Sequence, residues 1–169
     1  MAVHVEKAQV TLPSDREVAV TRTFDAPRAL VWDAYTKPEL MKRWLLGPPG
    51  WSMPVCEMDV RPGGGFRWRW RSDEDGKEFG FHGEFREVTA PSKLVHTEVY
   101  DPGDVGGTMG DEAALITVTF TERDGRTTMK SVMDFGSKKS RDEAMATGMT
   151  DGMEQSYQLL DAVLAERAG

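Results

Sequence analysis

The last thirty residues carry the feature that most restricts the fold, an apolar stripe at helical spacing. Apolar side chains recur there every three to four positions, as on a helix with one buried face. Ser140 and Glu143 have capping-box spacing, which predicts the helix start. The predicted helix has about 25 residues and is about 38 Å long, so only a broad sheet could cover its stripe. The stripe consists of Met145, Met149, Met153, Ser156, Leu160, Val163 and Leu164.

Small residues line one edge of this stripe at Gly148, Gly152 and Ser156. Each glycine inside a helix costs about 1 kcal/mol relative to alanine. The small residues therefore indicate either close backbone packing or volume left for a ligand. A continuous or slightly kinked helix is expected, and the alternative is a break with a second helix beginning near Asp151.

Strict alternation of aromatic and arginine side chains predicts a strand over residues 66–71. The Asp75-Gly76 pair that follows is typical of a two-residue hairpin turn. Such a turn places Phe66 opposite Phe85, Trp68 opposite Gly83 and Trp70 opposite Phe81. On the other face it places Arg67 opposite Glu84 and Arg69 opposite His82.

A second hairpin is predicted around Asp124-Gly125. Its register brings Ile116, Val118 and Phe120 beside an apolar row on the next strand. The threonines of the same strands fall on the solvent face. The apolar row is Met129, Ser131, Met133 and Phe135, and the threonines are Thr117, Thr119, Thr121 and Thr128.

The remaining elements complete an α+β pattern. Strands are expected over 5–12, 17–24, 51–60 and 93–100. One short helix opens at Pro27, and a second is expected from the capping-box spacing of Thr36 and Glu39. Two short helices after the first strands, then strands only, exclude alternating βαβ units. The order predicts a curved antiparallel sheet covered by the C-terminal helix.

Length and charge narrow the classes of function. With 169 residues, the chain is expected to form a single domain over 1–169. A net charge of −7 argues against nucleic-acid or anionic-membrane binding. One cysteine excludes an intrachain disulfide and a cysteine-cluster metal site. No signal-peptide core or membrane-length apolar run is present, so the expected location is cytoplasmic.

Several segments together resemble one known family. They are TRTFDAPRALVWDAYTKPELMKRW with a Gly-Pro-Pro-Gly loop, PGGGFRWRW, HGEFREV, APSKLVHTE and ATGMTDGMEQSYQLLDAVL. In this order they resemble the START-like (SRPBCC) superfamily, and within it the activator of heat-shock-protein-90 ATPase homologue family in its bacterial single-domain form. The resemblance covers about residues 16–166.

The resemblance implies a helix-grip (START/Bet v-like) fold, in which the sheet wraps the long C-terminal helix around a cavity for apolar ligands. Trp44 is followed here by Leu45, where relatives often carry a second tryptophan, which alters the expected cavity mouth. The eukaryotic co-chaperone of the family engages its chaperone through a further N-terminal domain, to which we expect no counterpart in this sequence.

Aromatic and methionine side chains are expected to meet between the sheet and the helix. They could form an ordinary core, yet methionine suits surfaces that accept varied ligands, and buried indoles need hydrogen-bond partners. A pocket lined by aromatics with a few polar groups is the usual small-molecule site. The expected ligand-binding residues are Trp44, Trp51, Phe66, Trp68, Trp70, Phe81, Phe85, His96, Glu98, Met129, Met133, Met149, Met153 and Tyr157.

The orientation of His96 and Glu98 depends on one turn. If Pro91 and Ser92 are the two central turn residues, Phe85 lies opposite Glu98, and His96, Glu98 and Tyr100 point into the cavity. With a three-residue loop they point outward. Inward, the carboxylate and imidazole would have shifted pKa values and could act as a general acid–base pair; an ordinary polar pair is the alternative.

Other chemistry finds little support. The three histidines lack metal-ligand spacing, so no metal and no cofactor is expected. Cys56 is expected to be a half-buried thiol. Residues 63–65 form a glycine turn without the residues of a phosphate-binding loop. The arginine row is expected to be a solvated face.

The sequence therefore predicts binding of a small apolar or amphipathic molecule without catalysis. The loops Gly47–Gly50 and Asp101–Asp111 would rim the entrance. The alternatives are a cyclase, dehydratase or hydrolase that uses Glu98 and His96, and a module that interacts with a chaperone or regulator. The identity of the ligand and the oligomeric state, including a homodimer, are left open.

Overall fold

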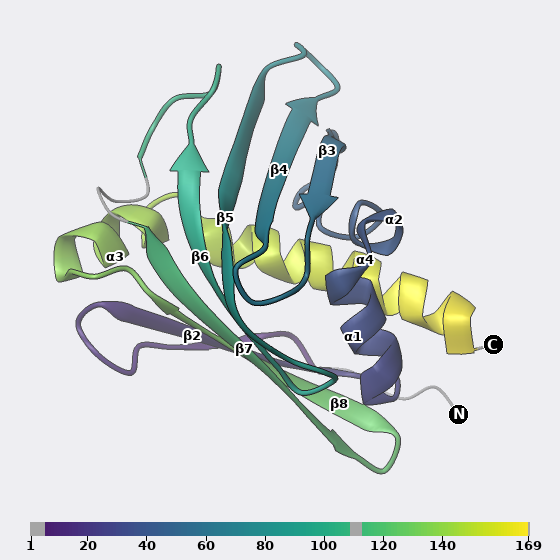
Figure 1. Ribbon diagram of the computed structural model, residues 1–169. Helices are drawn as coiled ribbons and strands as arrows, with labels where there is room; N and C mark the ends of the chain where they lie inside the picture. Colours follow the sequence, from purple (N-terminus) through teal and green to yellow (C-terminus); the bar gives the residue numbers. More distant parts are fainter. Residues whose placement is uncertain (1–5, 109–112, 169) are drawn as a thin grey trace.

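The structure is a computed structural model that describes residues 6–108 and 113–168. Most of it is an eight-stranded antiparallel sheet. The strand order is β1-β2-β8-β7-β6-β5-β4-β3, and the sheet curves around helix α4 (Figure 1). The α+β helix-grip architecture is thus confirmed. The strands are β1 (Gln9–Thr11), β2 (Glu17–Phe24), β3 (Trp51–Met58), β4 (Gly65–Ser72), β5 (Glu78–Thr89), β6 (Lys93–Asp101), β7 (Ala114–Arg123) and β8 (Arg126–Asp134).

Two short helices follow the first strands, as predicted, and two more form the C-terminal segment. They are α1 (Arg28–Thr36), α2 (Pro38–Met41), α3 (Lys138–Met145) and α4 (Met149–Ala168). The predicted capping box of α2 does not form, because Lys37 is the N-cap residue and the Thr36 hydroxyl donates to the Trp32 carbonyl. The first strand is shorter than expected, and Val5 lies outside the described residues.

The predicted continuous C-terminal helix is wrong, and the alternative of a break is correct. Gly148 adopts a left-handed φ of 77°, which ends α3 and lets α4 begin at Met149, two residues before the expected position. The predicted cap is also wrong: the Ser137 hydroxyl accepts a hydrogen bond from the Ser140 amide at 3.1 Å. Because of the break, α4 crosses the sheet in a direction different from that of α3 (Figure 1).

The predicted register of the β4–β5 hairpin is wrong by two residues. Phe66 pairs with Gly83, Trp68 with Phe81, and Trp70 with Phe79. The turn is longer than two residues, since Ser72 and Lys77 are joined by a backbone hydrogen bond of 2.9 Å. A shift of two residues keeps every side chain on its predicted face, because the side-chain period of a strand is two.

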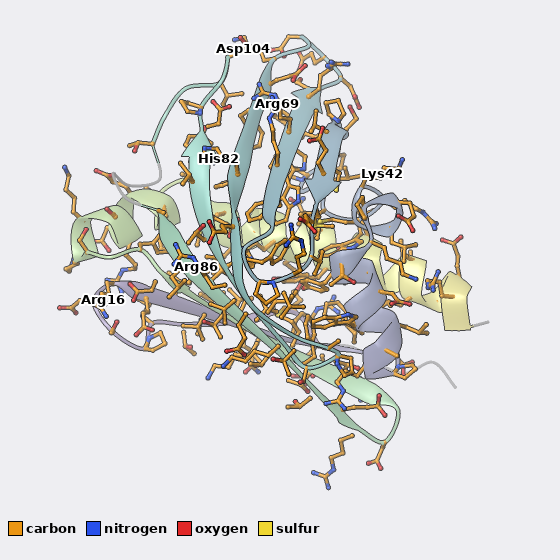
Figure 2. The ribbon with its side chains drawn as sticks, in the orientation of Figure 1. Arg16, Lys42, Arg69, His82, Arg86 and Asp104 are labelled. Atoms are coloured by element: carbon orange, nitrogen blue, oxygen red, sulfur yellow. The ribbon has the colours of Figure 1, made fainter. Side chains whose placement is uncertain are left out.

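The arginine face of β4 accordingly has different partners from those predicted. Arg67 pairs with His82 rather than Glu84, and Arg69 pairs with Gly80 rather than His82. Arg69 instead donates to carboxylates of Glu78 (3.0 Å) and Asp101 (2.8 Å). Figure 2 shows Arg69 and His82 on this part of the sheet, and the alternation of side chains places them on the face opposite the aromatic row.

The β7–β8 hairpin has the predicted register. Asp124 and Gly125 both have positive φ, as a tight hairpin turn requires. Ile116 pairs with Met133, and Phe120 pairs with Met129. These side chains are buried in the core that the sheet shares with α4.

A buried charge cluster ties α4 to β2. The Arg22 side chain is almost fully buried and donates to both oxygens of Glu154 (3.3 and 3.2 Å) and of Asp161 (2.8 Å each). Its guanidinium also lies 5.1 Å from the centre of the Phe24 ring. Bidentate arginine–carboxylate pairs are directional as well as strong, so this cluster sets the position of α4 along the sheet.

Replacing the buried cation should destabilise the fold far more than replacing an exposed one. Arg22→Met leaves two carboxylates without their partner and is expected to lower the free energy of unfolding by about 3 kcal/mol. The matched control, Arg16→Met, removes a surface pair with Asp134 and should change it by less than about 1 kcal/mol. Urea denaturation of both variants measures the difference; equal midpoints would show that the cluster does not anchor α4.

Candidate functional site

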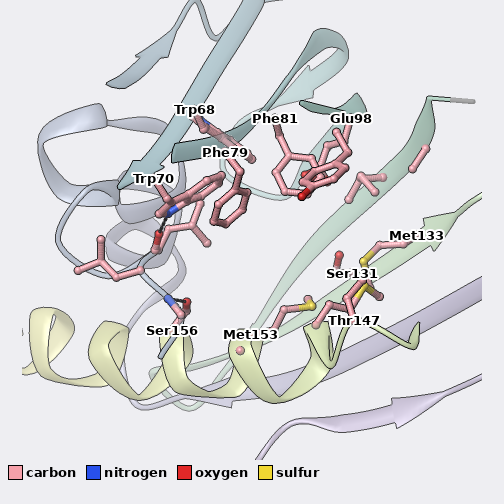
Figure 3. A pocket seen from close by; sticks show the side chains of 18 of the residues that line it. Trp68, Trp70, Phe79, Phe81, Glu98, Ser131, Met133, Thr147, Met153 and Ser156 are labelled. Atoms are coloured by element: carbon pink, nitrogen blue, oxygen red, sulfur yellow. Dashed lines mark hydrogen bonds between the residues drawn. The ribbon is translucent and has the colours of Figure 1, made fainter. Parts of the chain in front are cut away.

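A cavity of about 970 Å³ lies between the sheet and α4. Strands β4 to β8 supply its walls, α4 its floor, and the loop after α2 one side (Figure 3). Its volume is at the upper end of the range for sites that enclose a drug-sized ligand. The small residues Gly152 and Ser156 of α4 line it, as the second interpretation of the glycine edge proposed.

Most of the predicted ligand-binding residues line this cavity. Figure 3 shows Trp68, Trp70 and Phe81 on the sheet side, opposite Met153 of α4. The predicted residues that line the cavity are Trp44, Trp51, Trp68, Trp70, Phe81, Phe85, His96, Glu98, Met133, Met149, Met153 and Tyr157.

Phe66 and Met129 do not line the cavity, which corrects the prediction for both. The Phe66 ring lies 4.3 Å from the Trp68 ring and 5.6 Å from the Phe85 ring, centre to centre. Gly83 leaves the space that the Phe66 ring occupies, since a Cβ there would lie 2.7 Å from it. Met129 is fully buried opposite Phe120. Both residues belong to the packed core beside the cavity, on the same face of the sheet.

Other cavity residues were missing from the predicted set. The two-residue shift of the hairpin brings Phe79 to the wall, and the apolar face of α1 contributes Tyr35. The β7–β8 hairpin contributes further residues of its apolar rows, beside the predicted Met133. Tyr100 lines the cavity together with His96 and Glu98, as one of the two predicted orientations has it. The additional apolar and polar residues include Tyr35, Leu45, Phe79, Leu94, Ile116, Val118, Ser131 and Phe135.

Three of the four tryptophans that line the cavity, Trp44, Trp68 and Trp70, are buried and differ in how their indole N–H groups are bonded. Trp44 donates to the Ala34 carbonyl at 2.9 Å, and Trp70 donates to the Leu45 carbonyl at 2.6 Å. Trp68 is 8% exposed, and among the described residues its N–H has no hydrogen-bond partner. A buried donor without a partner carries a desolvation cost, and this one is on the cavity wall.

A β-bulge in β5 decides the orientation of His96 and Glu98. The turn is a three-residue loop, since Thr89 pairs with Lys93, and the predicted two-residue turn is wrong. The register then shifts between Phe85 and Glu87, so that Phe85 pairs with His96. The extra residue reverses the outward orientation that a three-residue loop would impose. His96 and Glu98 therefore line the cavity.

His96 lies among aromatic rings, with ring centres 5.3 Å from Phe66 and 5.8 Å from Phe85. Burial lowers the pKa of His96 to about 4, against a weak hydrogen bond to the Thr97 carbonyl at 3.4 Å. Its imidazole is therefore neutral at physiological pH.

Glu98 has the opposite shift. Burial raises the pKa of its carboxyl from 4.5 to about 7. Part of the side chain is accessible to solvent because it faces the cavity. His96 and Glu98 are two residues apart on one strand, so their Cα atoms are about 7 Å apart. In the described structure no hydrogen bond joins the two side chains.

Two loops border the cavity where the prediction placed its entrance. Gly47 and Pro48 line one side, and Val105 to Thr108 line the other; residues 109–111 of the predicted rim lie outside the described residues. The Gly47 amide donates to the Ser156 hydroxyl at 2.8 Å, and the Tyr100 hydroxyl donates to the Gly106 carbonyl at 2.6 Å. One contact joins the first loop to α4, and the other joins the second loop to β6.

The weaker candidates stay outside this site. No group of three or more His, Cys, Asp or Glu side chains in the described part of the chain could hold a metal ion. Burial raises the pKa of the half-buried Cys56 thiol to about 11, which disfavours the reactive thiolate. Residues 63–64 form a turn whose Gly63 amide donates to the Phe85 carbonyl at 2.8 Å. Among the helices of residues 6–108 and 113–168, none is long and apolar enough to cross a membrane.

The chain is similar to one protein family and to several solved structures. The family model described as Activator of Hsp90 ATPase homolog 1-like protein matches residues 25–165. A protein from Rhodobacter sphaeroides is 28% identical, over 95% of this chain and 99% of its own, with a TM-score of 0.83. One from Mycobacterium smegmatis is 24% identical, over 95% and 97%, with a TM-score of 0.80. The AHSA1-like protein from Aeromonas hydrophila is 20% identical, over 87% and 93%, with a TM-score of 0.68.

The comparison with curated proteins found no match.

Glu98 and His96 should give the stability of the protein opposite dependences on pH. The folded state holds the Glu98 proton more tightly than the unfolded chain, so raising the pH from about 4.5 to about 7 lowers the free energy of unfolding. The folded state keeps His96 neutral, so raising the pH from about 4 to about 6.5 increases it. The two contributions to the free energy of unfolding have opposite signs and partly cancel between about pH 4.5 and about pH 6.5, where both groups titrate.

Single substitutions should separate the two contributions. As the pH rises from 4.5 to 8, the free energy of unfolding of Glu98→Gln should increase by about 3 kcal/mol relative to that of the unsubstituted protein. His96→Gln should instead show a steeper fall across the shared range. Urea denaturation at stepped pH values tests both, and a Glu98→Gln profile parallel to that of the unsubstituted protein would contradict a buried Glu98.

Proposed function

Because the chain belongs to the activator of Hsp90 ATPase homolog 1-like family, we propose that it uses the START-like cavity to bind a small apolar or amphipathic molecule, without catalysis. The observation that carries the proposal is the cavity itself, about 970 Å³ of space walled by aromatic rings and methionines. A cavity of this size that is open at its entrance leaves the apolar surface of its wall in contact with water, which is unfavourable. A ligand that fills the cavity would remove that surface from water.

The composition of the wall favours a ligand with an apolar body. The rings of Trp70 and Phe79 stack 5.3 Å apart, and Phe81 and Tyr100 lie 5.4 Å apart. Methionine side chains from α4 form the opposite side and can adapt to different shapes. The Trp68 N–H has no partner among the described residues, but its nitrogen is buried within the wall, so the ligand's contacts on this side are expected to be mainly with ring carbons.

Acid–base catalysis is the second candidate, and the two shifted pKa values favour it. A carboxyl group with a pKa of about 7 could donate or accept a proton near neutral pH. However, His96 is held neutral and forms no hydrogen bond to Glu98 in the described structure, so the two residues do not form a coupled pair. Binding therefore remains the leading proposal.

A plug at the cavity entrance tests the binding proposal. Gly152 lines the cavity, and a Cβ built there would meet only Pro48, at 3.9 Å. Gly152→Trp should project an indole into the entrance and weaken binding of the neutral dye Nile red by about ten-fold or more. Fluorescence titration of the dye gives the dissociation constants.

The control for the plug is Gly152→Ala. Its methyl group fits the available space and also favours the helix by up to about 1 kcal/mol. Dye affinity should therefore stay within about two-fold of the unsubstituted protein. The proposal is wrong if the unsubstituted protein does not bind the dye, or if the folded Gly152→Trp variant, checked by circular dichroism, binds it equally well.

A further inference from the structure

The charged groups on the cavity wall are all acidic among the described residues. Two carboxyl groups line the cavity, Glu98 on β6 and Asp151 at the exposed start of α4, and no lysine or arginine lines it. The buried Arg22 is engaged with Glu154 and Asp161 and does not line the cavity. An anionic ligand such as a fatty-acid carboxylate would find no counterion there, and its charge would be repelled.

Glu98 lacks a partner of its own. Within the described structure, no hydrogen bond or ion pair connects its carboxyl group to another side chain or to the backbone. The residues opposite Glu98 in the sheet are Ala114 on β7 and, by the register of β5, Gly83. Neither has a polar side chain. Glu98 is half-buried and faces the cavity, so the cavity is the direction from which a partner for its carboxylate can come.

Aromatic side chains line the cavity on the same side as Glu98. Tyr100 follows Glu98 on the same face of β6, and its ring lies 5.4 Å from Phe81 and 6.2 Å from Phe79. Phe81 and Glu98 both extend into the cavity from the sheet side (Figure 3). Ring faces attract cations, most strongly where water is excluded. A carboxylate beside aromatic rings therefore suits a protonated nitrogen.

We propose that the ligand is an amphipathic amine, whose protonated nitrogen pairs with Glu98 while its apolar body fills the space between the aromatic wall and α4. This inference rests on the proposed binding function and defines the class of ligand for the same cavity. It also assigns Glu98 a role in selecting the ligand by charge, separate from any catalytic role.

Three probes with one apolar body test the inference: 4-phenylbutylamine, 4-phenylbutanol and 4-phenylbutyrate. Their affinities at pH 8 are measured by displacement of Nile red. The amine should bind about ten-fold more tightly than the alcohol, which is the gain expected from a charge-assisted hydrogen bond, and the carboxylate should bind most weakly. Equal affinity of the amine and the alcohol would overturn the inference.

Substitution of Glu98 identifies the residue responsible. Glu98→Gln should bring the affinity of the amine to within about three-fold of that of the alcohol measured on the same variant. Glu84→Gln is the matched control, because Glu84 is an exposed carboxylate in the same sheet that does not line the cavity. It should leave the preference for the amine intact. A preference that survives Glu98→Gln would also overturn the inference.

A pH change tests the same point without any substitution. Lowering the pH from 8 to 5.5 protonates Glu98, so the affinity of the amine should fall by about ten-fold while that of the alcohol stays constant. His96 remains neutral over this range. The other ionisable side chains that face this cavity are Tyr35 on α1, Tyr100 on β6, and Asp151 and Tyr157 on α4.

The outcomes separate the two proposals. If Nile red binds but the amine shows neither the preference nor the pH dependence, the choice of ligand class is wrong and the binding function stands. If Nile red does not bind to the unsubstituted protein and no probe binds in calorimetry, the binding function itself is wrong, and the inference fails with it.

Discussion

Helix α4 is bonded to strand β2 along one side and borders the cavity on the other, and the cavity exists because only one side of the helix is bonded to the sheet in this way. On the tied side, the guanidinium of Arg22 holds Glu154 and Asp161, and Leu160 and Leu164 are buried against the core. A charge buried with both its partners cannot slide without losing several directional bonds. The position of the helix is therefore set outside the cavity and needs no ligand to maintain it.

On the open side, other contacts hold the wall apart from the helix. The Trp70 indole stacks on Phe79 and donates to the Leu45 carbonyl, which fixes the ring to the loop after α2. The amide of Gly47 in the same loop donates to the Ser156 hydroxyl of α4. The wall and the helix are thus also connected through this loop, which borders the cavity.

The sequence predicted the faces of the strands better than their pairing. The alternation of aromatic and arginine residues placed Trp68 and Trp70 on the cavity side of the sheet. This prediction is correct despite the register error of two residues, because side chains of a strand return to the same face every two residues. The exact pairing depends on loop length, which Asp75-Gly76 did not determine. The β7–β8 hairpin was predicted correctly because both turn residues have the positive φ that their types favour.

The inward orientation of His96 and Glu98 could not be derived from the sequence. It results from two features, a three-residue loop and the bulge near Phe85, each of which alone would turn the side chains outward. The bulge has no glycine or proline signal of its own. Similarly, Gly148 could have been a packing residue inside one helix or the end of α3, and only its left-handed backbone distinguishes the two. Local sequence patterns did not decide either case because long-range packing selects between the alternatives.

A crystal structure under xenon pressure shows whether the space between the sheet and α4 is open, since xenon enters apolar cavities that lack ordered water. We expect xenon between the rings of Trp68 and Phe81 and the Met153 side chain of α4, with the Arg22 cluster unchanged. A structure in which α4 packs directly against these rings, with no xenon between them, would contradict this expectation.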